Sequence, residues 1–314
     1  MTCSLNENSI WEKRFSVGIA IETTLSDFEN MLNKYGRYID NFYGSIPLGD
    51  KFHGRVHIVN QFKNPDNINK FWEIAKLINK YGINLEIVFN TDNLTEEDFY
   101  MCRDELKKHE VTVDKIAILD KYYEQVQAIF QKVKLINSVN NMPNTLDGIR
   151  NISHKYDEIV IGRHFIRNVE AFHIVTKELG ADCVLLVNNG CSHICGGCRS
   201  FDYCKECYEK GREKTSAEYL YALQSILPYE ISEQYFDTSD VKLFKLSTRN
   251  ADTEFICKCL DSYIHNNGKE YVDKSLHHYL MWSRLIWHQD YFDSFDYERI
   301  RSIKQKICKN IKHV

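Results

Sequence analysis

The sequence predicts an α/β protein that folds as a (β/α)8 barrel of the TIM type. Eight short β-branched runs alternate with longer amphipathic stretches over residues 1–267, which is the strand–helix count of such a barrel. The runs are almost continuously apolar, as in parallel strands that helices cover. The competing fold, an open doubly wound sheet, needs fewer strands and a nucleotide-binding glycine motif. Neither G-x-G-x-x-G nor G-x-x-x-x-G-K followed by Ser or Thr occurs.

The predicted strands follow from these runs. They cover Phe15–Glu22, Asn41–Pro47, Leu85–Asn90, Val113–Leu119, Val133–Val139, Glu158–Gly162, Cys183–Asn188 and Val241–Leu246.

Helix start and stop signals lie between the predicted strands. Thr95 followed by Asp98 three residues later is typical of a capping box. A second helix is predicted to open at Asn67 and to end before Gly82, because glycine readily takes the left-handed conformation at a helix end. The stretch 168–179 repeats this pattern before Gly180.

The C-terminal part, residues 268–314, is predicted to be a helical extension packed on the barrel. It is first aromatic and then basic, with Tyr271, Tyr279, Trp282, Trp287, Tyr291 and Phe292 followed by Arg301, Lys304, Lys306, Lys309 and Lys312. The basic residues are expected on a solvated helix face. Alternatively, the aromatic helices form a contact with a protein partner or a second copy of the chain.

Charge and hydropathy exclude several classes of partner. Forty basic and 44 acidic residues give a net charge of −4, so no overall field favours nucleic acid or an anionic membrane. No apolar run approaches the ~20 residues of a membrane helix, and the first fifteen residues lack a secretory pattern. We therefore expect a cytoplasmic protein without membrane contact.

Five of the 11 cysteines lie close together after the predicted seventh strand, in a loop predicted to span residues 188–212. They are spaced C-x3-C-x2-C-x5-C-x2-C and comprise Cys191, Cys195, Cys198, Cys204 and Cys207. An odd total and the lack of an export signal argue against a disulfide framework. Clustered thiolates favour a soft metal centre.

Two metal centres are compatible with this spacing. A 4Fe–4S cluster needs Cys ligands, usually four, and Cys191, Cys195 and Cys198 with either Cys204 or Cys207 supply them. A structural zinc would instead use two C-x2-C pairs, although the gap between these pairs is shorter than in typical zinc ribbons. The loop follows a strand end, where barrels of this type build their active sites.

Three segments of the second half of the barrel resemble the collagenase-like (U32-type) peptidase family and its iron–sulfur relatives UbiU and UbiV. They are Tyr156–Arg163, the strand Val184–Cys191 with its N-x-G-C-like end, and Phe244–Arg249. The resemblance implies a (β/α)8-type barrel. It also implies a 4Fe–4S cluster that serves oxygen-independent hydroxylation, with Cys191 as a cluster ligand and Arg249 as the strand-eight arginine. The chain differs in having Thr248 where the family has glycine.

The C-x3-C-x2-C spacing also resembles that of radical S-adenosylmethionine enzymes. In those enzymes the motif follows the first barrel strand, whereas here it follows the seventh. S-adenosylmethionine is therefore an alternative cofactor, and a non-catalytic zinc-binding docking protein is an alternative function.

Polar residues at the predicted strand ends complete the candidate site. Glu22, Arg163, His164 and Arg249 are the candidate catalytic residues, and Asn90, Asn140 and Asn188 end other strands. The two arginines are predicted either to bind an anionic substrate or to pair with Glu22. The loop 47–55 is predicted to be a lid that carries Arg55. No serine-hydrolase or H-E-x-x-H motif occurs.

Overall fold

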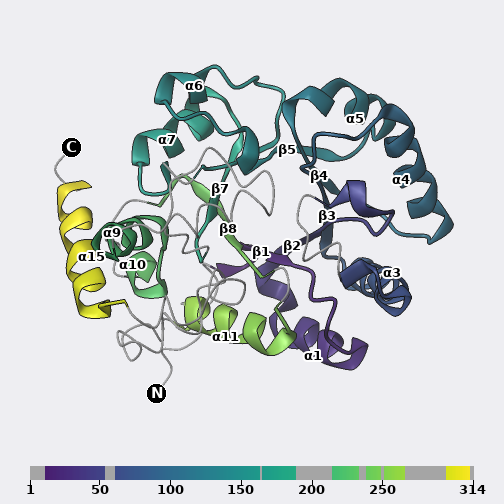
Figure 1. Cartoon of the computed structure of the whole chain (residues 1–314), viewed down its shortest axis with the longest axis horizontal. Coiled ribbons are helices and arrows are strands. Elements are labelled where there is room, and N and C mark those ends of the chain that lie inside the picture. Colours follow the sequence, from purple (N-terminus) through teal and green to yellow (C-terminus); the bar gives the residue numbers. More distant parts are fainter. Residues whose placement is uncertain are drawn as a thin grey trace.

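The computed structural model describes residues 11–53, 61–162, 165–188, 214–232, 238–248, 251–265 and 295–311. Eight parallel strands pair in chain order, and the last pairs with the first to close a barrel (Figure 1). They are β1 (Phe15–Gly18), β2 (Ile39–Gly44), β3 (Asn84–Phe89), β4 (Lys115–Ile118), β5 (Lys134–Asn137), β6 (Glu158–Val160), β7 (Asp182–Leu186) and β8 (Val241–Leu246). The predicted fold class is confirmed.

Most observed strands are shorter than the apolar runs that predicted them. The run 15–22, for example, pairs as a strand only to Gly18. Ile19, Ala20 and Ile21 stay buried after the strand has ended. Apolar residues therefore continue past the last paired residue because they fill the core around the barrel.

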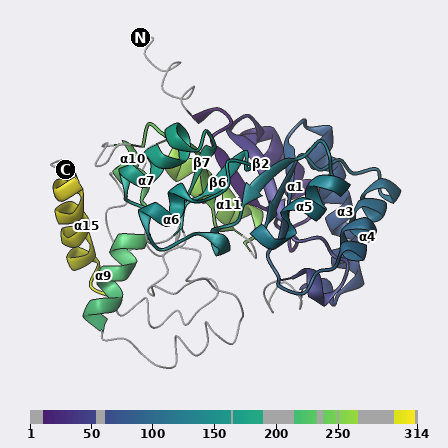
Figure 2. The same ribbon diagram turned by 90° about the horizontal axis from the view of Figure 1, so that it is seen from above.

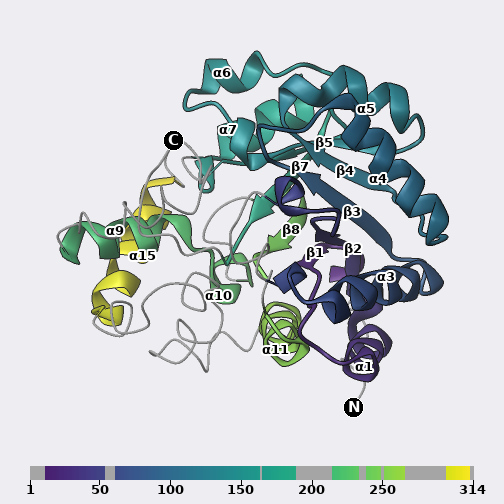
Figure 3. The ribbon, with the colours of Figure 1, turned by 45° about the vertical axis from the view of Figure 1, so that its right-hand side comes forward.

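The helices of the barrel lie around the strands in all three views (Figures 1–3). They are α1 (Leu25–Tyr35), α3 (Pro65–Lys80), α4 (Glu96–Lys108), α5 (Tyr123–Ile129), α6 (Leu146–Arg150), α7 (Val169–His173) and α11 (Thr253–Ile264). The predicted capping box of Thr95 and Asp98 is present at the start of α4. Gly82 and Gly180 both have positive φ, at 64° and 70°, which suits glycine.

Two predicted helix positions are corrected. The helix expected to open at Asn67 begins at Pro65, because the Asn64 side chain accepts a hydrogen bond from the Asp66 N–H at 3.0 Å and proline suits a first turn. The stretch 168–179 is not one regular helix. After α7 it continues as a π-helical turn, Ile174–Glu178.

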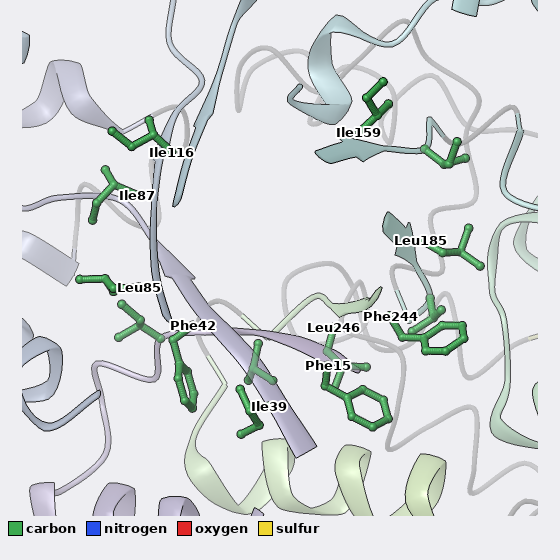
Figure 4. Close-up of a cluster of buried hydrophobic side chains, with 14 of the residues drawn as sticks. Phe15, Ile39, Phe42, Leu85, Ile87, Ile116, Ile159, Leu185, Phe244 and Leu246 are labelled. Carbon is green, nitrogen blue, oxygen red and sulfur yellow. The ribbon is translucent and has the colours of Figure 1, made fainter. Parts of the chain in front are cut away.

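The hydrophobic core between strands and helices encloses the barrel. It joins strand side chains such as Phe42 and Leu85 to helix side chains such as Phe28 and Phe71, all essentially inaccessible to solvent. Figure 4 shows a set of the strand side chains. A second, smaller cluster contains only residues of β4 to β8 and no helix residue, so it marks the inside of the barrel. It consists of Ala117, Ile136, Val160, Val184 and Leu243.

The C-terminal helix α15 (Tyr297–Ile311) lies beside α9 (Lys214–Gln224) and close to α10 (Pro228–Ser232), at the side of the barrel opposite α3 and α4 (Figure 2). Residues 266–294, which include the predicted aromatic helix, lie outside the described residues. Lys304 is not on a solvated basic face, as was expected. Its side chain is 1% exposed and pairs with Glu230 of α10.

No helix among the described segments is long and apolar enough to span a bilayer.

Candidate functional site

Asn188 ends the seventh strand region and marks where the cysteine segment begins. Its side chain is fully buried, and its Oδ1 accepts a hydrogen bond from the Ser247 N–H at 2.6 Å, just after β8. Its Nδ2 lies 3.5 Å from the Ser247 carbonyl oxygen. The Asn188 side chain therefore links the ends of β7 and β8 by hydrogen bonds and is not exposed to solvent.

The chain returns to the same strand end after the cysteine segment. The Ile226 N–H, which follows α9, donates to the Val187 carbonyl at 2.9 Å. Segment 189–213 therefore starts directly at this strand end. Its other end is separated from the Ile226 contact by the 11 residues of α9, a length of about 16 Å. All five clustered cysteines lie outside the described residues.

A buried ion-pair network supports this return. Arg167 Nη2 lies 2.6 Å from Glu230 Oε1, and Lys304 Nζ lies 3.1 Å from Glu230 Oε2. Both cations also donate to the carbonyl oxygens of Ala222 and Ser225, at the C-terminal end of α9. Positive charge is favourable there because the last carbonyls of a helix lack intrahelical donors. Burial raises the pKa of Glu230, but Arg167 and Lys304 outweigh it and hold that pKa below its ordinary value.

The strands on either side of β7 end in the same rim. At the end of β6, the Phe165 N–H donates to the Gly162 carbonyl at 3.0 Å. At the end of β8, Thr248 Oγ1 accepts from the Gly18 N–H at 2.7 Å. The predicted residues that follow, Arg163, His164 and Arg249, lie outside the described residues.

Glu22 is the one candidate catalytic residue that the structure describes. It is exposed, and its Oε1 accepts a hydrogen bond from Gln61 Nε2 at 3.1 Å. Together with Thr24, Asp27, Asp252 and Cys257 it lines a groove of about 510 Å³ between α1 and α11. Figure 3 shows these two helices side by side. The predicted pairing with Arg163 or Arg249 stays a prediction.

The predicted lid is packed in its described part. Phe52 is fully buried, and Thr91 Oγ1 donates to the Lys51 carbonyl at 2.8 Å, which ties this loop to the one after β3. Gly54 and Arg55 lie outside the described residues.

The inside of the barrel carries charged side chains that the sequence analysis did not identify. Because tilted strands are staggered, inward residues of alternate strands share a level. The pairing register gives three levels of inward side chains, counted from the N-terminal end of the barrel. The first level, from β2, β4, β6 and β8, consists of Asn41, Lys115, Glu158 and Leu243. The second, from β1, β3, β5 and β7, consists of Ser16, Glu86, Ile136 and Val184, and the third, again from β2, β4, β6 and β8, consists of Tyr43, Ala117, Val160 and Lys245. Barrel interiors are usually dominated by branched apolar residues. Here the side formed by β1, β2, β3 and β8 is polar.

Two inward lysines, Lys115 and Lys245, form ion pairs with the carboxylates of the barrel interior. Lys115 Nζ pairs with Asp40 Oδ2 at 2.6 Å and with Glu158. Burial lowers the pKa of Lys115, but the two carboxylates raise it above its ordinary value, whereas burial raises the pKa of Glu158 despite this pairing. Lys245 Nζ lies 2.7 Å from Glu86 Oε1 and 4.0 Å from the centre of the Tyr43 ring.

The described cysteines form no metal site. Cys102, Cys183 and Cys259 are buried in the core, and burial raises the pKa of each thiol. Burial likewise raises the pKa of Cys257 to about 11. Among the residues that the structure describes, no three His, Cys, Asp or Glu side chains converge as metal ligands. These four thiols are structural, so the clustered cysteines remain the candidate ligands.

No family model and no curated protein matches the sequence. Solved structures with a similar arrangement include a U32 peptidase, with 11% identity over 56% of this chain and 69% of that one, at a TM-score of 0.38. The tryptophan synthase α-subunit of Pyrococcus furiosus has 9% identity over 82% and 96% of the two chains, at a TM-score of 0.41. A putative orotidine-monophosphate decarboxylase from Toxoplasma gondii has 7% identity over 97% and 95%, also at 0.41. These likenesses carry nothing about ligands or activity.

Proposed function

We propose that the chain is an iron–sulfur barrel protein in which Cys191, Cys195 and Cys198, with Cys204 or Cys207, hold a 4Fe–4S cluster. Its activity is a redox modification of an anionic substrate at the barrel mouth, of the oxygen-independent hydroxylation type. The observation that carries the proposal is the place where segment 189–213 leaves the barrel. Asn188, the residue before the segment, is hydrogen-bonded to Ser247 at the C-terminal ends of β7 and β8, and barrels of this type build their active sites at this end.

The donor set fits the group. Cysteine thiolates are the usual ligands of iron–sulfur clusters, and the sequence supplies five within 17 residues. When bound, such a cluster supplies one-electron redox chemistry. The buried thiols of Cys102, Cys183 and Cys259 do not compete for iron, because burial raises their pKa and keeps them protonated.

The other strand ends supply polar groups to substrate. Arg163 and His164 follow Gly162 of the β6 end, and Arg249 follows Thr248 of the β8 end, so their places in the sequence adjoin β7 on both sides. Guanidinium groups bind carboxylate or phosphate with paired hydrogen bonds. We therefore assign the two arginines to substrate binding and His164 to proton transfer.

Serine substitutions in anaerobically purified protein test the ligand assignment. We expect wild-type protein to be brown and to contain iron with acid-labile sulfide. Cys191→Ser, Cys195→Ser and Cys198→Ser should each lose most of the iron, because serine is a poor ligand for this centre. Cys257→Ser is the matched control and should retain it, since Cys257 is a half-buried thiol of α11 outside the segment.

Two other results would identify the alternative functions. Colourless protein with one tightly bound zinc per chain would contradict the cluster and indicate a zinc-binding accessory protein. Release of methionine and 5′-deoxyadenosine from S-adenosylmethionine by the reduced protein would replace the hydroxylation-type activity with radical chemistry.

A further inference from the structure

The two interior lysines have different surroundings. Lys115, on the first level, pairs with two carboxylates, and its side chain is 3% exposed. Lys245, on the third level and nearer the mouth, pairs with Glu86 alone among the described carboxylates, and its side chain is 10% exposed. An ammonium group has three donors, and Glu86 accepts one of them. Lys245 therefore uses one of its three donors on a described carboxylate, whereas Lys115 uses two.

The level above Lys245 is formed partly by small residues. By the same register it holds Gly18, Val88, Ser138 and Leu186, of which Gly18 has no side chain. Val88 is only partly buried, although the inward residues of the levels below are buried. Exposure thus increases toward the C-terminal end of the barrel, and Lys245 lies next to the residues that solvent reaches.

Two buried oxygen atoms belong to neighbours of the Lys245–Glu86 pair: Ser16 adjoins Lys245 in register, and Asn41 donates to Glu86. Ser16 Oγ and Asn41 Oδ1 are fully buried and find no hydrogen-bond partner among the described residues. Ser16 is the register neighbour of both Lys245 and Asn41. Buried polar atoms nearly always bond to protein, ordered water or a ligand. Of these two atoms, the Ser16 hydroxyl can donate to an anion, whereas the Asn41 amide oxygen can only accept a hydrogen bond, as from water.

We propose that Lys245 binds an oxyanion, a carboxylate or phosphate group of a small molecule that enters through the barrel mouth. The Ser16 hydroxyl donates to the same group. Glu86 and Asn41 hold the lysine in place, because Asn41 Nδ2 donates to Glu86 Oε2 at 2.7 Å and Glu86 Oε1 accepts from Lys245. This inference rests on the proposed function for the anionic character of the substrate, and it adds the residue at the floor of the mouth that binds the anion.

Trace acetylation of the intact wild-type protein tests this proposal. Site-resolved mass spectrometry compares the labelling rates of Lys245, of Lys115 and of the exposed Lys76 as internal reference. The reactions are run in chloride, inorganic phosphate or oxalate at equal ionic strength. We expect Lys245 to be labelled in chloride and to lose most of its labelling in phosphate or oxalate. Lys115 should stay unlabelled, and Lys76 should not respond to the anion.

Each other outcome overturns the proposal. Labelling of Lys245 as slow as that of Lys115 would mean that the mouth does not reach it, and labelling unaffected by both anions would mean that no oxyanion binds. The anion that protects better distinguishes a phosphate from a carboxylate group. Metal analysis of the same sample separates this result from a failure of the iron–sulfur assignment.

A pair of charge-balanced variants gives a second measurement. Lys245→Met with Glu86→Gln removes the proposed site without leaving an unpaired carboxylate in the barrel. Phosphate should raise the Tm of wild-type protein, and this rise should be lost in the variant; no rise in wild-type protein would contradict phosphate binding. Lys115→Met with Glu158→Gln is the matched control and should keep the rise. An equal rise in both variants would contradict the assignment of Lys245.

Discussion

His53 is the described residue from which we expect the clearest pH dependence of stability. It is 6% exposed, and its ring stacks on the Phe62 ring with the two centroids 5.0 Å apart. Neither ring nitrogen hydrogen-bonds to any described residue. Burial therefore lowers the pKa of His53 to about 4, although the nearby Asp50 opposes this shift.

The sign of the effect follows from proton linkage. The folded pKa lies below the unfolded value of 6.5, so the stabilisation is fully present above pH 6.5 and is lost as pH falls through about 4. Between pH 7.5 and pH 5 the free energy of unfolding should fall by about 2 kcal/mol from this group alone. Urea denaturation at the two pH values should show that His53→Phe removes this part of the slope.

The exposed His265→Gln is the control and should keep the wild-type slope. If His53→Phe and wild-type protein lose the same stability on acidification, then the His53 ring is not kept neutral by burial.

Single residues of the barrel interior could not be predicted from the sequence. The run V-K-L-F-K-L was correctly predicted as the eighth strand, but its two lysines have opposite surroundings. Lys242 is exposed, whereas Lys245 points into the barrel. Alternation places strand residues three apart on opposite faces, so it predicts that the two lysines face opposite ways. It does not tell which lysine faces the barrel interior, because each face of the run carries one lysine and two apolar residues.

At the scale of elements, the C-terminal helix α15 packs against α9, the helix that follows the cysteine segment in the sequence. The buried cations Arg167 and Lys304 hold Glu230 and the last carbonyls of α9, so three segments distant in sequence meet at one network. Lys304 was predicted on a solvated face because basic helix residues usually lie there. Its partner lies 74 residues away in the sequence, and no local pattern connects the two.

Lys304→Met should therefore be strongly destabilising. The substitution leaves Glu230 with one cation and removes a donor from the carbonyls of Ala222 and Ser225. We expect a loss of about 3 kcal/mol in the free energy of unfolding, measured by urea denaturation. Amide hydrogen exchange should increase first in α9 and α15.

Lys306→Met, an exposed position on the same helix, is the control and should change stability by less than about 0.5 kcal/mol. A similar small effect for Lys304→Met would show that the network contributes little.

At the scale of the whole molecule, the barrel and its strand count could be predicted because buried parallel strands leave near-continuous apolar runs. The charged side chains inside the barrel could not. Glu86 and Lys245 come from β3 and β8, which are far apart in sequence, and only the stagger of the closed barrel brings them to neighbouring levels. The seventh strand, after which the clustered cysteines follow in the sequence, was predicted correctly, since β7 covers Asp182–Leu186.

Iron and acid-labile sulfide, quantified per chain in anaerobically purified wild-type protein, test the central claim most directly. An account in which the clustered cysteines hold a 4Fe–4S centre predicts about four irons and an equal amount of sulfide per chain. Protein that is fully folded, by the cooperativity of its unfolding, but contains zinc or no metal in place of iron and sulfide would contradict it.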